Sequence, residues 1–257
     1  MTRAVWFNCS AGVAGDMLLA ALIDAGADRL AVMDAWAALG VDGFAATWER
    51  VQRCGVSSLW TNLAIDDHHD DHHHDADQRS GDHDHQHEHP HRPAREVVAS
   101  IEAADLPDPV RRNAVAVYRR LAEVEGAIHG SDPDEVELHE VGALDSILDV
   151  VGICAALHDL GIERLEHSPV AVGHGTVRTA HGDLPNPVPA VTRLLADAGV
   201  TTVGLDTTME LSTPTGVAIL TVLGDGSGPM TAMAVRATGF GAGTADPPGR
   251  PNVVQAV

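Results

Sequence analysis

The chain opens with AVWFNCSAGVAGDMLLAALIDAG, residues 4–26. Residues 4–7 form a short apolar run of strand length, and the glycine-containing residues 8–16 read as a loop. Apolar residues then recur at helical spacing, and Gly26 stands where a helix would end. The opening therefore predicts a strand, a loop and a helix in succession, a unit typical of folds that mix helices with strands.

The rest of the chain continues this mixed pattern. We expect helices at residues 30–39, 97–104, 110–128, 143–160, 189–198 and 215–223, and strands at 44–53, 59–65, 169–172, 200–203 and 233–236. The predicted fold class is α/β or α+β. A His/Asp-rich insert at residues 66–93 interrupts it, so we expect a small N-terminal unit at residues 1–65 and a larger α/β unit at residues 94–257.

The charge of the chain excludes several classes of protein. Asp plus Glu number 37 against 16 Lys plus Arg, which gives a formal net charge of −21, and every basic residue is an arginine. So acidic a chain repels phosphate, and we expect no nucleic acid and no membrane among its partners. The lack of lysine excludes a phosphate-binding lysine and Schiff-base chemistry. The three cysteines form no paired motif, which favours a cytoplasmic location.

Residues 66–91 hold ten His, eight Asp and one Glu. With Ala76 as its one apolar side chain, this stretch cannot bury a core, and we expect it to be disordered. Imidazole suits nickel, zinc and copper, and alternating histidines place several nitrogens within reach of one ion. The candidate metal ligands here are His83, His85, His87 and His89. The alternative is a tract that concentrates metal without taking part in chemistry.

A second metal-binding pattern is HEVGALDSILD, residues 139–149. Asp145 and Asp149 are four residues apart, so a helix would carry both carboxylates on one face. Like charges so placed repel each other unless a cation or an arginine lies between them. His139 and Glu140, just before the helix, could complete a metal site. A solvated helix face with acids near its N-terminus explains the pattern equally well.

Loops elsewhere could bind other parts of a ligand. Residues 12–16 join the first strand to its helix, where backbone N–H groups can hold a phosphate, although a tight turn is as good an explanation. Residues 180–189 form a proline-rich loop, residues 209–216 lead into a helix, and residues 239–243 read as a glycine-rich turn. The side chains of interest in these loops are Asp16, His181, Glu210, Ser212, Thr213 and Thr215.

Taken in order, these segments resemble a known family. They are NCSAGVAGDM at residues 8–17, the histidine-rich insert, LHEVGALDSILD at 138–149, AHGDLP at 180–185, ELSTPTG at 210–216, GFGAG at 239–243 and RPNV at 250–253. The series is similar to the nickel-insertion proteins of lactate racemase maturation (LarC type), and it spans nearly the whole chain.

The resemblance implies a nickel chelatase of the lyase class. Such a protein inserts Ni²⁺ into pyridinium-3,5-bisthiocarboxylic acid mononucleotide, with CTP and Mg²⁺ or Mn²⁺, and its nickel-pincer nucleotide product serves a lactate racemase-type acceptor enzyme. Forming the nickel–carbon bond requires metal ligands and a base for the pyridinium proton. Our catalytic candidates are Glu140, Asp145, His181 and Glu210, our substrate-binding candidates are Gly12, Gly15, Asp16, Thr213 and Thr215, and our metal ligands are His139, Glu140, Asp145 and Asp149 with the four tract histidines.

Two features depart from the family pattern. Asn8 stands where the family usually has an aspartate, which removes one carboxylate. Members commonly continue beyond the RPNV segment into a C-terminal domain associated with CTP, and we expect that domain to be absent here or to be a separately encoded subunit. A nickel storage or delivery protein without catalysis is the alternative. An α/β hydrolase ranks last, because the sequence has no nucleophile elbow.

Overall fold

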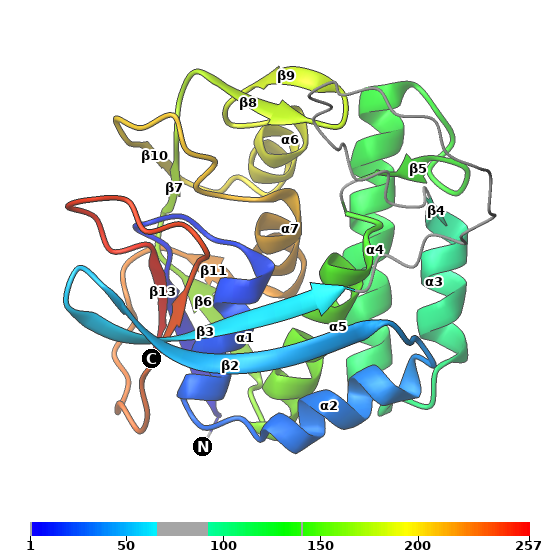
Figure 1. The fold of residues 1–257 in the computed structure, drawn as a ribbon. Helices are drawn as coiled ribbons and strands as arrows, with labels where there is room; N and C mark the ends of the chain where they lie inside the picture. The colour runs from blue at the N-terminus through cyan, green and yellow to red at the C-terminus, as the bar shows by residue number, and fades with distance from the viewer. Residues whose placement is uncertain (1, 66–91, 140) are drawn as a thin grey trace, which may run out of the picture.

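The computed structural model describes residues 2–65, 92–139 and 141–257 (Figure 1). Its helices are α1 (Gly15–Asp24), α2 (Arg29–Ala38), α3 (Ala94–Ala103), α4 (Asp108–His129), α5 (Leu144–Asp159), α6 (Pro189–Asp197) and α7 (Pro214–Leu223). Its strands are β1 (Ala4–Asn8), β2 (Phe44–Arg53), β3 (Val56–Ile65), β4 (Arg92–Pro93), β5 (Glu137–Leu138), β6 (Arg164–His167), β7 (Val170–Val172), β8 (Thr176–Thr179), β9 (Gly182–Pro185), β10 (Thr202–Gly204), β11 (Gly226–Ser227), β12 (Gly239–Ala242) and β13 (Val253–Ala256).

A seven-stranded mixed sheet has the order β11-β6-β1-β13-β12-β3-β2. Strand β1 is parallel to β6 and antiparallel to β13. Beyond β13, β12 is parallel to β3, and the hairpin β2–β3 forms one edge of the sheet. Strands from both ends of the chain therefore share one sheet. The division into units at residues 1–65 and 94–257 stays a prediction.

Helix α1 lies directly against strand β12 because two glycines in that strand leave room for it. A Cβ atom on Gly241 would lie 1.9 Å from the carbonyl oxygen of Met17, and one on Gly239 would lie 2.1 Å from the carbonyl oxygen of Ala21. Neither position can hold a larger side chain without moving the helix. This close contact fixes the N-terminus of α1 relative to the sheet.

Helix α5 packs on α1 and also contacts α2 and α4. Trp36 of α2 is almost completely buried, and its indole N–H donates a hydrogen bond of 2.7 Å to the carbonyl oxygen of Leu148. A Cβ atom on Gly152 of α5 would lie only 3.0 Å from Nε1 of the same indole. These contacts fix the middle of α5 against α2.

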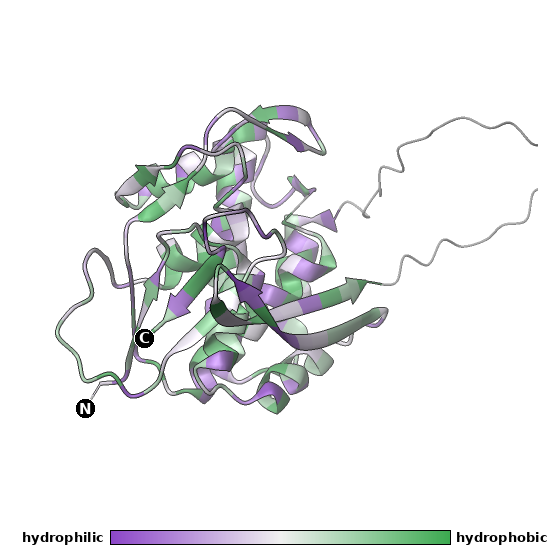
Figure 2. Cartoon of the chain, turned by 60° about the vertical axis from the view of Figure 1, so that its left-hand side comes forward, coloured by the Kyte–Doolittle hydropathy of each residue, from purple (hydrophilic) through white to green (hydrophobic). Residues whose placement is uncertain are grey.

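The helices that close the structure are amphipathic. Helix α4 buries Val110, Val117, Tyr118, Leu121 and Val124, while its arginines and glutamates lie on the outside. In Figure 2 the helices accordingly carry both hydrophilic and hydrophobic residues, as expected for elements with one face on the core. Among the described residues no helix is both long enough and apolar enough to cross a membrane.

The mixed α/β class and most of the predicted elements are confirmed. The helical period located the seven helices of the described residues to within a few residues, and the strand at 44–53 coincides with β2. The hairpin β2–β3 was predictable because residues 44–53 and 59–65 alternate in polarity on either side of Gly55, and in the structure Gly55 has a positive φ of 82°. The predicted disorder of the insert falls on residues 66–91, which lie outside the described residues.

Two local predictions are wrong. Residues 233–236 form no strand, because they run along the surface, mostly exposed, without a neighbouring strand to pair with. Residues 239–242, which read as a turn, form strand β12 between β13 and β3. Glycine has a low strand propensity, but only glycine fits at residues 239 and 241 because α1 packs so closely on this strand. Packing therefore overrides propensity here. In the proline-rich loop, strands β8 and β9 form a hairpin with His181 in its turn.

Candidate functional site

Three helix N-termini surround one open cavity of about 340 Å³. Helix α1 contributes Gly15 and Asp16, α5 contributes Asp145, Ser146 and Asp149, and the start of α7 contributes Thr213, Pro214 and Thr215. The remaining lining residues are Ala14, Thr61, Asn62, Leu63, Val141, Glu210 and Thr244. We call this cavity the acid pocket, after Asp16, Asp145, Asp149 and Glu210. Its volume falls in the range of about 300–1,000 Å³ that is usual for small-molecule sites.

Asp16, in the first turn of α1, has an unusual protonation equilibrium. Burial raises the pKa of its carboxyl group from 3.8 to about 6, and the charge of Asp145 adds to the increase. A hydrogen bond of 2.8 Å from the backbone N–H of Met17 opposes the shift. A carboxylate with a pKa near neutrality can accept a proton and later release it, which is what a general base requires.

Asp149 lies deeper, against the backbone of α1. A Cβ atom on Gly15 would lie 2.4 Å from its Oδ2 atom, so only glycine fits at residue 15. Burial raises the pKa of Asp149 well above its usual value, and the charges of Asp16 and Asp145 raise it further. A hydrogen bond from the backbone N–H of Asp16 opposes this shift. Asp16 and Asp149 are thus two acids in direct electrostatic contact at the floor of the pocket.

Two buried oxygen atoms in the pocket wall have no hydrogen-bond partner within the described structure. They are Oδ1 of Asp149 and Oγ1 of Thr61, which projects from β3. Buried polar atoms are almost always hydrogen-bonded, and an exception that faces a cavity indicates that a water molecule or a ligand supplies the bond. The pocket is therefore equipped to bind a polar molecule.

Hydroxyl groups also line the acid pocket. Thr213 caps α7, its Oγ1 accepting a 3.2 Å hydrogen bond from the backbone N–H of Gly216. The hydroxyl of Thr215 donates to Ser146 Oγ across 3.4 Å and so links α7 to α5. Asp145 and Glu210 are exposed at the rim, where they can reach a bound molecule from solvent.

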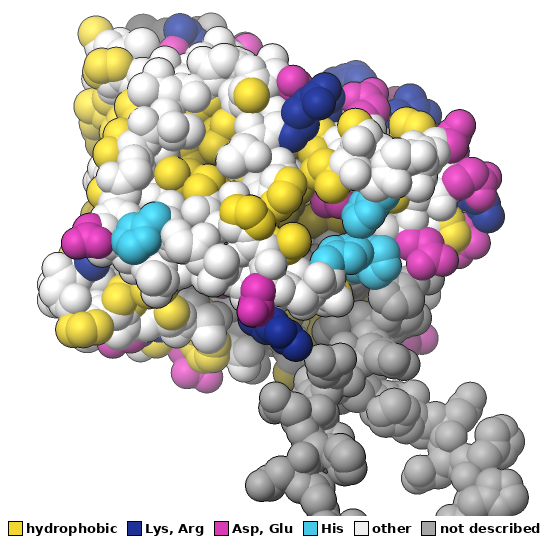
Figure 3. Space-filling view, turned by 90° about the horizontal axis from the view of Figure 1, so that it is seen from above, with side chains coloured by type: hydrophobic (Ala, Val, Ile, Leu, Met, Phe, Trp, Pro, Cys, Tyr) yellow, Lys and Arg dark blue, Asp and Glu magenta, His cyan; other side chains and the backbone are white. Residues whose placement is uncertain are grey.

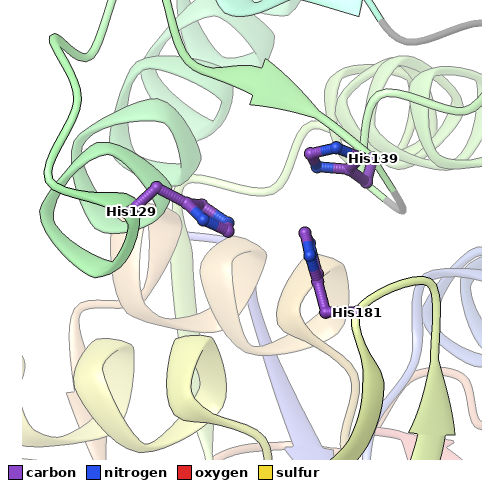
Figure 4. A group of neighbouring side chains, drawn as sticks. All are labelled: His129, His139 and His181. Carbon is purple, nitrogen blue, oxygen red and sulfur yellow. The ribbon is translucent and has the colours of Figure 1, made fainter.

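Three histidines lie together beside the acid pocket, on separate elements (Figure 4). His129 ends α4, His139 follows β5, and His181 stands in the β8–β9 turn. One ring nitrogen from each lies within 4.8 Å of the others. The ring centroids are 4.5 Å apart for His139–His181, 4.9 Å for His129–His181 and 6.0 Å for His129–His139. We call this group the histidine cluster.

The histidine cluster borders a smaller cavity of about 190 Å³. Its walls include Leu184, Val188 and Ala190, and histidine side chains flank a hollow with a hydrophobic surface in Figure 3. Pro214 lines both this cavity and the acid pocket. The two sites are therefore neighbours that share one wall at the start of α7.

The structure brings most of the predicted site residues together, but in two groups. Gly15, Asp16, Asp145, Asp149, Glu210, Thr213 and Thr215 line the acid pocket. His139 and His181 lie in the histidine cluster, so His139 does not join Asp145 and Asp149 in the single metal site that the sequence suggested. Glu140 and the tract histidines His83, His85, His87 and His89 lie outside the described residues.

Gly12 lies away from the acid pocket, in the turn after β1. Its backbone N–H donates to the carbonyl oxygen of Cys9 at 3.0 Å. A Cβ atom there would lie 1.8 Å from the carbonyl oxygen of Leu211, and its φ of 106° also favours glycine. Gly12 thus permits a close contact between two loops.

Cys9 is buried in the core, and burial raises the pKa of its thiol far above the usual range.

Sequence reasoning missed His129 and the polar residues of β3. His129 directly follows the helix predicted at residues 110–128, and nothing in the spacing connects it with His181, more than fifty residues away. Thr61 and Asn62 lie in a strand whose alternation predicted no more than an ordinary strand. Two adjacent polar residues in the middle of the apolar run at residues 59–65 were the one available indication.

Comparison with known proteins supplies an independent observation. Residues 5–257 match the family described as nickel insertion protein. The chain is 42% identical over 255 residues to a pyridinium-3,5-bisthiocarboxylic acid mononucleotide nickel insertion protein of Nocardioides sp., covering 99% of this chain and 59% of that protein. It is 35% identical over 257 residues to a Staphylococcus saprophyticus protein of the same description, covering 100% of this chain and 60% of that protein.

A third relative has a similar description. The chain is 39% identical over 249 residues to a putative nickel insertion protein of Syntrophobacter fumaroxidans, covering 96% of this chain and 58% of that protein. The chain therefore spans about three fifths of the length of these relatives. No solved structure matches it.

Proposed function

Because the chain belongs to the nickel insertion protein family, we propose that it inserts Ni²⁺ into pyridinium-3,5-bisthiocarboxylic acid mononucleotide, with the acid pocket as the substrate site. The observation that carries the proposal is the acid pocket itself. It brings together residues as far apart in sequence as Asp16 and Glu210. Two of its buried oxygen atoms have no hydrogen-bond partner within the described structure. Relatives whose names specify this substrate match the chain almost end to end.

The chemistry requires a base, and the acid pocket supplies one. When nickel bonds to a pyridinium carbon, a C–Ni bond replaces a C–H bond and the proton must leave. Asp16 suits this role because its pKa of about 6 leaves it ionised at neutral pH and still able to hold a proton. Asp145 and Glu210, exposed at the rim, serve as ligands for the incoming nickel.

The phosphate of the mononucleotide would lie at the helix N-termini. The starts of α1, α5 and α7 point their backbone N–H groups and positive dipole ends toward the acid pocket. Thr213 and Thr215 add hydroxyl groups beside the α7 terminus. The same dipoles offset part of the repulsion among the four acids, which explains how such a pocket remains folded.

We propose that residues 1–257 carry only part of the activity. CTP with Mg²⁺ or Mn²⁺ would be handled by a C-terminal part of the kind that makes up the remaining length of the relatives. The product would pass to a lactate racemase-type acceptor enzyme in the cytoplasm. On this view the chain is the nickel chelatase portion of a larger catalyst.

Glu210→Gln tests the proposed function. The protein is incubated with Ni²⁺, the mononucleotide, CTP and Mg²⁺, with and without the C-terminal part of a full-length relative, and the nickel-containing product is measured by mass spectrometry. Removing the rim carboxylate should lower its formation about 100-fold, within the range for a catalytic carboxylate. The matched control is Glu163→Gln, at an exposed residue outside the pocket.

Two results would contradict the proposal. If the parent protein binds nickel but forms no product under either condition, the storage or delivery function replaces the chelatase function. If Glu210→Gln and Glu163→Gln form product equally well, the acid pocket is not where the reaction occurs.

A further inference from the structure

The histidine cluster has the form of a metal site that the function of the acid pocket does not require. Each histidine comes from a different element, so only the folded chain brings the three imidazoles together. Their ligand nitrogens lie within 4.8 Å of one another, a spacing that one ion at about 2.0–2.1 Å from each nitrogen can bridge with small side-chain adjustments. Within the described ranges, this is the one group of three or more ligand side chains that is so closely spaced.

A glutamate carboxylate lies near a ring nitrogen of two of the three histidines. Nε2 of His129 lies 3.5 Å from Oε2 of Glu125, and Nε2 of His139 lies 4.0 Å from Oε2 of Glu137. In protein metal sites a ligand imidazole commonly uses one ring nitrogen for the metal and donates its other N–H to a carboxylate, which fixes the ring and increases its basicity. Glu125 also lines the cavity beside the cluster.

The two neighbouring sites differ in chemistry. The acid pocket offers oxygen ligands, which suit hard cations, and no three of its carboxylates meet the spacing found in the histidine cluster. The histidine cluster offers neutral nitrogen ligands, which suit nickel, copper and zinc. Three imidazoles also leave coordination positions open, so an ion held there could still take up sulfur ligands from another molecule.

We propose that His129, His139 and His181 form the site at which the chain first holds Ni²⁺, next to but separate from the acid pocket. Pro214 lines both cavities, so an ion held by the histidine cluster lies next to the proposed substrate site. This inference rests on the proposed function for the identity of the metal, but the site itself is defined by the geometry of the three imidazoles.

The test uses the full chain with the ten histidines of residues 66–91 replaced by glutamine, so that the tract does not mask the site. Ni²⁺ is added alone and followed by calorimetry, and the coordination is measured by nickel X-ray absorption. We expect one ion per chain with three imidazole ligands. His129→Ala, His139→Ala and His181→Ala should each weaken binding about 100-fold.

The matched control is His158→Ala, which removes an exposed histidine at the end of α5 and should leave affinity unchanged. Each variant is also checked by circular dichroism, and His129→Gln provides a second substitution that preserves helix propensity at the end of α4. Unchanged affinity in folded variants at all three positions would overturn the proposal.

The outcome is separable from that of the proposed function. If nickel binds to the cluster as expected but no product forms in the insertion assay, the metal site stands and the chelatase function fails. If the cluster variants lose no nickel affinity while insertion proceeds, the function stands and this inference is wrong.

Discussion

Asp16→Asn is expected to make the protein more stable and, at the same time, to lower nickel insertion about 100-fold or more. The side chain is partly buried, and the raised pKa shows that folding penalises its charged form. A shift from 3.8 to about 6 corresponds to a penalty on the order of 2–3 kcal/mol at neutral pH. The neutral amide removes that penalty, and its oxygen can still accept the hydrogen bond from Met17.

The increase in stability that Asp16→Asn produces should depend on pH. Because the pKa of Asp16 is higher in the folded than in the unfolded protein, the folded state binds a proton that the unfolded state releases between about pH 4 and pH 6. The stability of the parent protein therefore falls as pH rises through this interval. The stability of Asp16→Asn does not fall in this way, because its amide does not titrate. The difference in stability between variant and parent should therefore be near zero below about pH 4 and reach its full size above about pH 6 to 7.

Thermal melting at pH 4, 6 and 8 measures the effect. An increase in Tm of about 5 °C at pH 8 is expected for a chain of this length. Asp42→Asn, which removes the same charge from an exposed position, should change Tm by less than about 1 °C. A lower Tm for Asp16→Asn at pH 8 would contradict the prediction, because it would mean that the folded protein stabilises the charged form of Asp16.

Gly241→Ala should destabilise the protein by about 3 kcal/mol, at the upper end of the usual cost of overpacking. The added methyl group would lie 1.9 Å from the carbonyl oxygen of Met17 and 2.6 Å from the backbone nitrogen of Ala21. Both atoms belong to the backbone of α1, which cannot rotate away as a side chain would. The helix must move from the sheet, and Asp16 at its N-terminus moves with it.

Chemical denaturation provides the measurement, with Gly204→Ala as the matched control. Gly204 lies in strand β10, and a Cβ atom there would meet nothing within 4 Å. The control should therefore stay within about 0.5 kcal/mol of the parent. Equal stability of the two variants would mean that α1 does not pack on β12 as described.

The helical part of the fold was predictable because its pattern is local. The stripe along residues 110–128 and the stop signals at Gly26, Gly130 and Gly161 fix helix positions from the sequence alone. Strand β12 was not predictable, because Gly239 and Gly241 are there for α1 rather than for the sheet. The strand predicted at residues 233–236 is wrong for the opposite reason: the short apolar run resembles a strand, but no strand of the described residues pairs with it.

The candidate site was partly predictable for a related reason. The spacing of Asp145 and Asp149 predicted that both carboxylates lie on one face of a helix and could form a site. The sequence could not show that they differ, with Asp145 exposed at the rim and Oδ1 of Asp149 buried against α1. Nor could it connect His129 with His139 and His181, because that contact depends on how α4 and the β8–β9 hairpin pack.

The most direct test of the account is a crystal structure of the protein bound to pyridinium-3,5-bisthiocarboxylic acid mononucleotide. The account predicts the pyridinium ring in the acid pocket, with its carbon facing Asp16, its phosphate at one of the helix N-termini of α1, α5 or α7, and polar groups within hydrogen-bond distance of Asp149 Oδ1 or Thr61 Oγ1. A mononucleotide bound elsewhere on the chain, with the acid pocket filled only by water, would contradict it.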